Sequence, residues 1–235
     1  MAESSVRRQK RKALAASGRR LTPAQRVKRA AVMTAAGRKL RAAGLASRGR
    51  ASIVRDAASG PFQDIGRVLA VLRRLDLPHA LIGGWAVVVW GYLRTSEDID
   101  VLVDLPSSRR RELLDALAGD YEADWRAGGE DDPIPGLVSA VPRSPDRFPV
   151  DLLPARGRAD RRALSRAVNV TAEGISIPVV SAEDLISMKL EAGGGQDYAD
   201  ARRLLATLKG DLDEARLEAS CRERRALDRL ALIRR

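Results

Sequence analysis

The chain has 235 residues and a formal net charge of +11, with one cysteine and one histidine. This length is sufficient for a full-sized domain with a buried core. The single Cys221 excludes an internal disulfide framework and a cysteine-based zinc cluster, and the single His79 removes most histidine metal chemistry. The sequence has no run of eighteen apolar residues and no apolar signal core, so we expect a cytoplasmic protein that does not contact membranes.

The positive charge is concentrated at the start of the chain. Residues 1–50 hold 15 Lys or Arg and one acidic residue, whereas residues 51–235 hold 27 basic and 30 acidic residues. We predict a basic arm over residues 1–60, flexible or in short helices, that binds tRNA or another RNA through its phosphates. A solvated tail, an organelle transit peptide and a start codon assigned too far upstream are the alternatives.

A folded domain is predicted to begin at about residue 61. Apolar residues at helical spacing predict a helix over 62–77, and they are Ile65, Val68, Leu69, Leu72 and Leu75. A short buried strand over 79–82 then ends at Gly83 and Gly84, and the apolar run 85–93 predicts a helix directly after these glycines.

Strands and helices are predicted along the rest of the chain. They are a strand over 98–104, a helix over 107–118 capped by Ser107, strands near 121–126, 136–141 and 147–153, a helix near 158–167, a strand pair around Glu173 and Gly174, and three helices that begin at Ala182, Asp197 and Asp211.

Residues 81–104, LIGGWAVVVWGYLRTSEDIDVLVD, carry the most informative pattern. Gly83 and Gly84 at a strand end let a phosphate approach the backbone N–H groups at the start of the following helix. Asp98 and Asp100 lie two residues apart on a strand, so both carboxylates project from one face and can hold Mg²⁺. Alone, the glycine pair is ordinary for a turn and the aspartate pair is ordinary for a solvated strand face. Together they predict a triphosphate site.

This stretch resembles the nucleotidyltransferase superfamily typified by DNA polymerase beta, whose motif is Gly-Gly or Gly-Ser, a spacer, then Asp, an apolar residue and Asp or Glu. The residues that fit this motif are Gly83, Gly84, Asp98, Ile99 and Asp100. The segment RTSEDID is similar to the form found in minimal and AbiEii-like bacterial members, with Arg94 and Ser96 in the matching places. Serine instead of threonine at position 96 is a mild departure from this form.

The resemblance extends over about residues 61–208 and implies an α/β fold. We expect a nucleotidyltransferase core over 61–180, in which a mixed β-sheet is flanked by helices. A C-terminal helical region over 181–235 and the basic N-terminal arm complete the predicted organisation.

The superfamily implies a third carboxylate on a neighbouring strand, and the segment RFPVDLLPA supplies Asp151. Asp146 is the competing candidate, but it lies between Pro145 and Arg147 in a predicted turn, where an exposed aspartate is ordinary. We favour Asp151 because burying an unpaired aspartate within VDLL is costly, and a metal ion relieves that cost.

Residues 177–204 resemble the C-terminal helical segment of AbiEii-type enzymes, in which a lysine is followed, after a loop, by an Asp-x-x-Asp helix start. Lys189, Asp197 and Asp200 occupy these places. Lys189 is expected to contact the triphosphate. The alternative is that its aliphatic stem lies over the edge of the core while its ammonium group is in water. Asp197 is expected in the nucleotide site, and its alternative is a helix N-cap.

The resemblance implies transfer of a nucleoside monophosphate from an NTP to an acceptor hydroxyl, with release of pyrophosphate. Two Mg²⁺ ions, or Mn²⁺, would be held by Asp98, Asp100 and Asp151, and Asp151 would complete the site that activates the acceptor.

The expected triphosphate ligands surround the metal site. Gly83 and Gly84 would hold the β- and γ-phosphates, and Arg94, Ser96 and Lys189 would position the triphosphate. The resulting catalytic set is Asp98, Asp100, Asp151 and Lys189, and the nucleotide-binding set is Gly83, Gly84, Arg94, Ser96, Lys189 and Asp197.

The sequence alone does not identify the acceptor molecule. We favour a toxin-like or RNA-modifying enzyme that acts on tRNA or other RNA and that has an antitoxin protein as partner. A small-molecule (antibiotic) nucleotidyltransferase, a protein nucleotidyltransferase and a non-catalytic RNA-binding relative of the fold are the alternatives.

Overall fold

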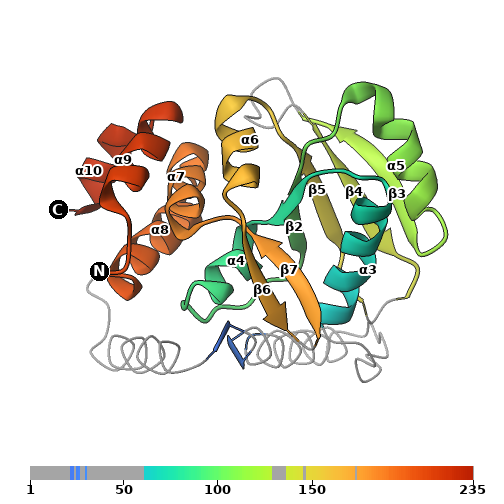
Figure 1. The fold of residues 1–235 in the computed structure, drawn as a ribbon, viewed down its shortest axis with the longest axis horizontal. Helices are drawn as coiled ribbons and strands as arrows, with labels where there is room; N and C mark the ends of the chain where they lie inside the picture. Colours follow the sequence, from blue (N-terminus) through green and yellow to red (C-terminus); the bar gives the residue numbers. More distant parts are fainter. Residues whose placement is uncertain are drawn as a thin grey trace, which may run out of the picture.

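A computed structural model describes residues 22, 23, 25, 26, 30, 61–128, 136–144, 147–172 and 174–234. Within these residues, seven strands form one sheet in the order β3-β4-β5-β2-β1-β7-β6 (Figure 1). The strands are β1 (His79–Leu81), β2 (Ile99–Val103), β3 (Tyr121–Ala127), β4 (Gly136–Pro142), β5 (Val150–Pro154), β6 (Val168–Ala172) and β7 (Ile175–Val179). The pairs β2–β5 and β1–β7 are parallel and the other pairs are antiparallel, which confirms the predicted mixed sheet.

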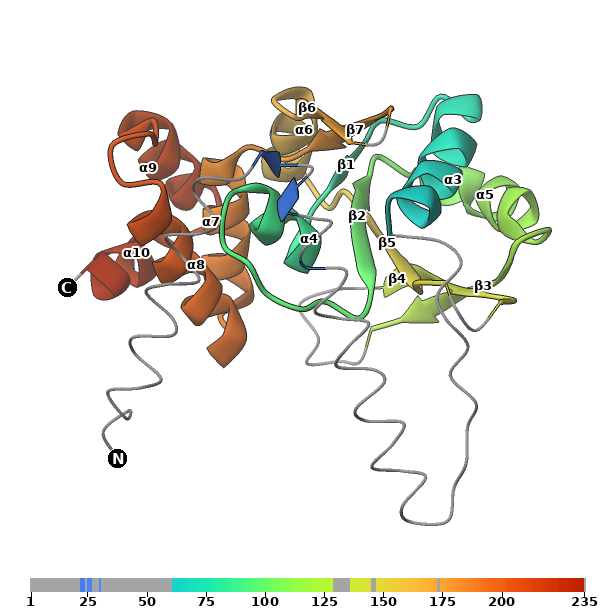
Figure 2. The same ribbon diagram turned by 90° about the horizontal axis from the view of Figure 1, so that it is seen from below.

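Helices flank this sheet. They are α3 (Pro61–Arg74), α4 (Gly83–Val89), α5 (Arg110–Leu117), α6 (Arg158–Ser165), α7 (Ala182–Ala192), α8 (Gly195–Thr207), α9 (Glu214–Glu223) and α10 (Leu227–Arg234). Helices α3 and α5 contact each other, and α4 contacts both β2 and α7. Figure 2 shows α7 to α10 as a helical group on one side of the sheet, with α4 between this group and β2. No helix of the described segments is long and apolar enough to cross a membrane.

The apolar pattern of the sequence accounts for the core. In α3, Ile65, Val68, Leu69 and Leu72 are buried, and Asp64 in the first turn and Arg73 and Arg74 in the last turn suit the helix dipole. In β2, Ile99, Val101 and Val103 are buried on the face opposite Asp100. Burial of each such side chain contributes about 2 kcal/mol before entropic costs.

Three details of the predicted elements are wrong. Helix α4 spans Gly83–Val89 rather than 85–93, because the chain turns at Gly91, whose φ is 112°. Ser107 does not cap a helix, since it opens a 3₁₀ turn over Ser107–Arg109 that precedes α5. The last predicted helix is two helices, α9 and α10, because Arg225 between them has a φ of 54°.

Most of the predicted arm over residues 1–60 lies outside the described residues. In its described part, the Thr22 hydroxyl accepts from the Gln25 backbone N–H and the Gln25 side chain accepts from the Thr22 N–H, which is a capping box at a helix start. Ala30 is completely buried in the hydrophobic core. Part of the basic segment therefore packs against the folded body.

Candidate active site

Three carboxylates converge where β2 and β5 lie side by side. These parallel strands pair Asp100 directly with Asp151, and register partners project from the same face of a sheet. Asp98 lies immediately before β2. Each of the three side chains offers one oxygen that lies within 4.8 Å of the others. The structure thus brings together the three predicted metal ligands, whereas the competing Asp146 lies outside the described residues.

The carboxylates repel one another in a partly desolvated place. Burial raises the pKa of Asp100 to about 6, and the charges of Asp98 and Asp151 add to this effect, while Lys189 and the Gly84 N–H oppose it. Burial also raises the pKa of Asp151, with a further contribution from Asp98, and the Ser139 hydroxyl opposes it. A divalent cation would relieve this repulsion, and a set of carboxylate oxygens suits Mg²⁺ or Mn²⁺, so the residues present fit the implied metal.

The two glycines at the start of α4 are required by close packing. Gly83 has a φ of 62°, and a Cβ at this position would overlap the Asp100 carboxylate. A Cβ on Gly84 would overlap the Ser96 hydroxyl. The backbone N–H of Gly84 opposes the rise in the pKa of Asp100, so the start of α4 favours the ionised form of this aspartate.

Arg94 and Ser96, both predicted to position the triphosphate, contact carboxylates here. The buried Ser96 hydroxyl donates to Asp98 Oδ1 at 3.3 Å. Arg94 Nη1 lies 2.6 Å from Asp200 Oδ2. Ser96 therefore orients a predicted metal ligand, and Arg94 joins the segment before β2 to helix α8.

Lys189 on α7 lies beside the same group of residues. Its Nζ is 2.7 Å from Asp197 Oδ1 and 3.6 Å from Asp200 Oδ2, and its side chain is only 14 % exposed. The ammonium is therefore held by carboxylates rather than extended into water. The alternative role of Asp197 as a helix cap is wrong, because Gly194 is the N-cap of α8 and no side chain caps it.

The sequence analysis assigned no role to two residues of this region. Asp200 is fully buried and accepts from Arg94 and Gln196, so it anchors the cationic side of the site. Ser139 on β4 is in register with Asp151 and supports that carboxylate. A single polar residue within the apolar strand GLVSAVP is the signal that points to Ser139.

Residues 67–234 match a family model described as the nucleotidyl transferase AbiEii toxin of type IV toxin–antitoxin systems. The chain belongs to the AbiEii nucleotidyltransferase family. The match includes every residue of the site described above, and it makes this protein a nucleotidyltransferase. The predicted superfamily membership and enzyme class are confirmed.

A search of curated proteins found no match. Among solved structures, a nucleotidyltransferase-like antigen of Paracoccidioides brasiliensis has 17% identity and a TM-score of 0.45, with 74% of this chain and 92% of that chain covered. The antibiotic-resistance factor ANT(2'')-Ia has 19% identity and a TM-score of 0.46, with 73% and 94% covered. A Thermotoga maritima nucleotidyltransferase has 14% identity and a TM-score of 0.44, with 62% and 92% covered.

Replacing Lys189 with Met is expected to lower the kcat/KM of this AbiEii protein for an NTP by about 30-fold. The substitution keeps the apolar stem but removes the cation beside Asp197 and Asp200, leaving two carboxylates near a tetra-anionic substrate. The exposed Lys209, the other lysine in residues 51–235, gives the control Lys209→Met. Steady-state kinetics on both variants checks this, and equal activities would contradict a role for Lys189.

Proposed function

We propose that this protein transfers a nucleoside monophosphate from an NTP to a hydroxyl group of RNA, with tRNA as the favoured acceptor. The acceptor oxygen forms a bond to the α-phosphorus, the bond from that phosphorus to the β-phosphate oxygen breaks, and pyrophosphate leaves. The observation that carries the proposal is the convergence of Asp98, Asp100 and Asp151 beside the start of α4.

Mg²⁺ held by these three carboxylates would neutralise the triphosphate charge and lower the pKa of the acceptor hydroxyl. Strand β2 lies between β1 and β5, so Asp100 has Gly83 on one side and Asp151 on the other. The triphosphate binds on the side of α4 and Lys189, and the acceptor approaches on the side of β5. Asp151, which lies on that side, takes the proton of the acceptor hydroxyl.

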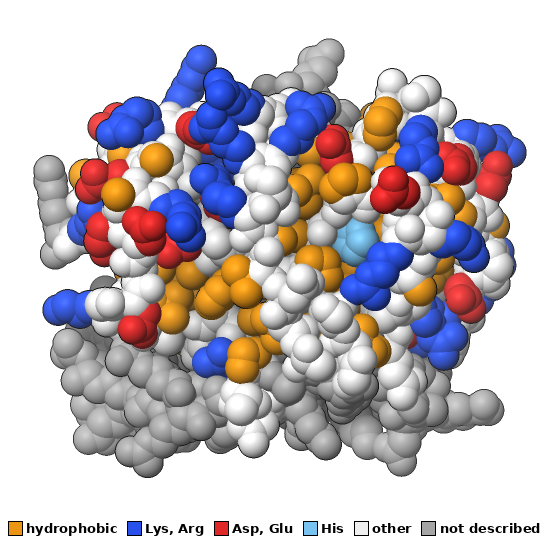
Figure 3. Space-filling view, viewed as in Figure 1, with side chains coloured by type: hydrophobic (Ala, Val, Ile, Leu, Met, Phe, Trp, Pro, Cys, Tyr) orange, Lys and Arg blue, Asp and Glu red, His pale blue; other side chains and the backbone are white. Residues whose placement is uncertain are grey.

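The choice of RNA rests on charge. Residues 1–50 contribute 15 basic residues and one acidic residue, and the remaining 185 positions have more acidic than basic residues. Figure 3 shows Lys and Arg side chains together with Asp and Glu on one face of the folded body. The arm therefore supplies the sequence-independent attraction to phosphates.

The proposed organisation is a basic arm over 1–60, a catalytic core over 61–180 and a helical region over 181–235. An enzyme that uses NTPs and tRNA would act in a bacterial cytoplasm. The family is one of type IV toxins, so we also propose an antitoxin protein as its partner.

The test is transfer of label from each α-labelled NTP in turn, with Mg²⁺, in the presence and absence of total tRNA. We expect label on tRNA from one NTP, loss of that label with EDTA, and loss in an Asp98→Asn variant. Label on small hydroxyl compounds or on protein, but not on RNA, would contradict the RNA acceptor. Absence of transfer to every acceptor would contradict catalysis and favour a non-catalytic RNA-binding protein.

A further inference from the structure

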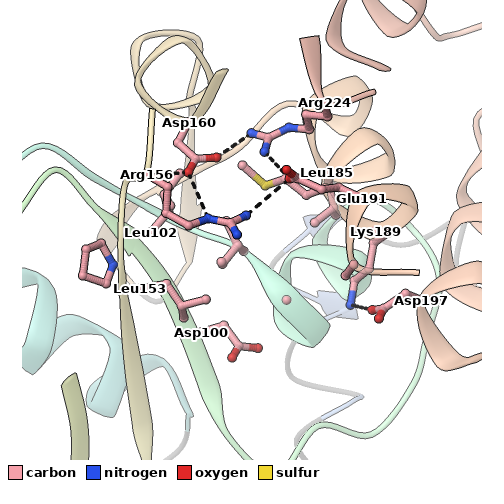
Figure 4. A pocket seen from close by; sticks show the side chains of 15 residues that line it. Asp100, Leu102, Leu153, Arg156, Asp160, Leu185, Lys189, Glu191, Asp197 and Arg224 are labelled. Atoms are coloured by element: carbon pink, nitrogen blue, oxygen red, sulfur yellow. Dashed lines mark hydrogen bonds and ion pairs between the residues drawn. The ribbon is translucent and has the colours of Figure 1, made fainter. Parts of the chain in front are cut away.

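A cleft of about 280 Å³ extends from Asp100 along β2 and β5 (Figure 4). Its first end is lined by Gly83, Asp100, Lys189 and Asp197, and its far end by Arg156, Asp160, Glu191 and Arg224. This volume is close to the lower end of the roughly 300–1,000 Å³ that is typical of small-molecule sites. The cleft therefore has room for more than the phosphates of a substrate.

The middle of the cleft is apolar. Leu102 and Leu153 are register partners, two residues beyond the paired Asp100 and Asp151 on the same face. Two residues of a strand span about 7 Å, so this leucine pair lies roughly one ribose beyond the carboxylates. Leu185 and Met188 of α7 also line the cleft. These side chains suit a flat aromatic ring better than a charged group.

Paired charges form the far end. Arg224 lies 2.7 Å from Asp160 and 2.6 Å from Glu191, and it is almost completely buried. Arg156 lies 3.4 Å from Glu191 and 3.8 Å from Asp160. The side chains of Arg156 and Glu191 are 36 % and 33 % exposed, so these two are the members that a ligand can reach.

The charge balance of this cluster indicates its ligand. Two guanidinium groups and two carboxylates give no net charge, so the cluster does not favour a phosphate. Its accessible members offer a donor and an acceptor side by side. The edge of a nucleobase also presents donors and acceptors together, in a pattern that differs between bases.

We propose that Arg156 and Glu191 recognise the nucleobase of the NTP and thereby select the nucleotide that this enzyme transfers. The base lies between the leucine pair and Met188, and the buried pair of Arg224 with Asp160 holds Arg156 and Glu191 in position. The inference rests on the proposed function, because it requires the triphosphate to lie at the carboxylate end of the cleft.

The test compares Mg²⁺ complexes of the four NTPs with Mg²⁺–tripolyphosphate, which has the phosphates but no nucleoside. Calorimetry on the full-length protein gives the Kd of each. Met188→Trp fills the middle of the cleft, and Arg156→Gln removes the charge from an exposed side chain without disturbing the core. Arg158→Gln is the matched control, since Arg158 is also exposed and does not line this cleft, although it lines an adjoining depression that shares Arg156 and Glu191.

We expect the wild type to prefer one NTP. Met188→Trp should weaken NTP binding at least about tenfold and leave tripolyphosphate binding unchanged. Arg156→Gln should change the preference among the four NTPs by about tenfold, which is the effect of losing a hydrogen bond to a charged group. Arg158→Gln should bind all ligands like the wild type.

Unchanged NTP preference in Arg156→Gln would overturn the inference, even if Met188→Trp failed to fold. Equal weakening of NTPs and tripolyphosphate in Met188→Trp would also overturn it, because the cleft would then hold phosphates. If the wild type binds tripolyphosphate but binds no NTP more tightly than tripolyphosphate, the result contradicts this inference and leaves the proposed donor site standing. A wild type that binds neither contradicts the proposed donor site as well.

Discussion

Replacing Asp100 with Asn is expected to lower the rate of nucleotide transfer at least about a thousandfold and to stabilise the metal-free protein. The loss of activity follows because Asp100 belongs to the carboxylate group expected to hold the metal ion, and a thousandfold corresponds to about 4 kcal/mol of transition-state stabilisation. The gain in stability follows because burial and Asp98 raise the pKa of Asp100 to about 6, so its ionised form opposes folding.

The pH dependence of this effect has a definite sign. The protonated Asp100 is favoured by folding, so its contribution to stability is complete below its ordinary pKa of 3.8 and is lost as the pH rises through about 6. Asn is uncharged at every pH. The difference in melting temperature between Asp100→Asn and the wild type should therefore increase from pH 4 to pH 7.

Thermal unfolding of both proteins in EDTA, at a series of pH values, measures this difference. Addition of Mg²⁺ should raise the melting temperature of the wild type and have a smaller effect on the variant. A variant that retains transfer activity, or that is less stable than the wild type at pH 7, would show that Asp100 is not a repelled metal ligand.

Replacing Gly83 with Ala is expected to lower transfer activity by about a hundredfold and to destabilise the fold by about 2–4 kcal/mol. The backbone at Gly83 has a φ of 62°, which costs an L-residue roughly 1–2 kcal/mol. The added methyl group would also overlap the Asp100 carboxylate, so this side chain must move. A displacement of about 1 Å at a reacting centre can cost a hundredfold in rate.

Gly119→Ala is the control for Gly83→Ala, since a Cβ at Gly119 meets no atom within 4 Å and its φ is not positive. Denaturant unfolding and single-turnover kinetics measure the two effects separately. Normal stability and activity in Gly83→Ala would mean that the start of α4 has room for a side chain and does not fix Asp100.

The sequence predicts the carboxylate side of the site because its residues lie close together along the chain. Gly83 and Asp100 belong to one strand–helix–strand unit whose pattern resembles a known superfamily, and the same resemblance points to Asp151 on the next parallel strand. The structure places these residues in register or contact, as expected from the alternation of side chains along β2 and β5.

The other side of the cleft depends on contacts that no local pattern encodes. Arg156, Glu191 and Arg224 come from segments around α6, α7 and α9, and each resembles an ordinary surface residue when its own segment is considered. The pairing of Arg94 with Asp200 likewise joins distant segments. The break between α9 and α10 also has no local signal, because neither glycine nor proline marks it. Arg225 adopts the left-handed conformation there instead.

The pairing of Asp100 with Asp151 across two parallel strands has a consequence for synthesis of the protein. Parallel strands require a long crossover, and here the segment between these residues includes α5, β3 and β4. Lys189 lies still further along the chain. Contacts of such high sequence separation form only after most of the chain is available. If Lys189 takes part in the site as proposed, we expect the site to be complete only after the region through Lys189 has left the ribosome.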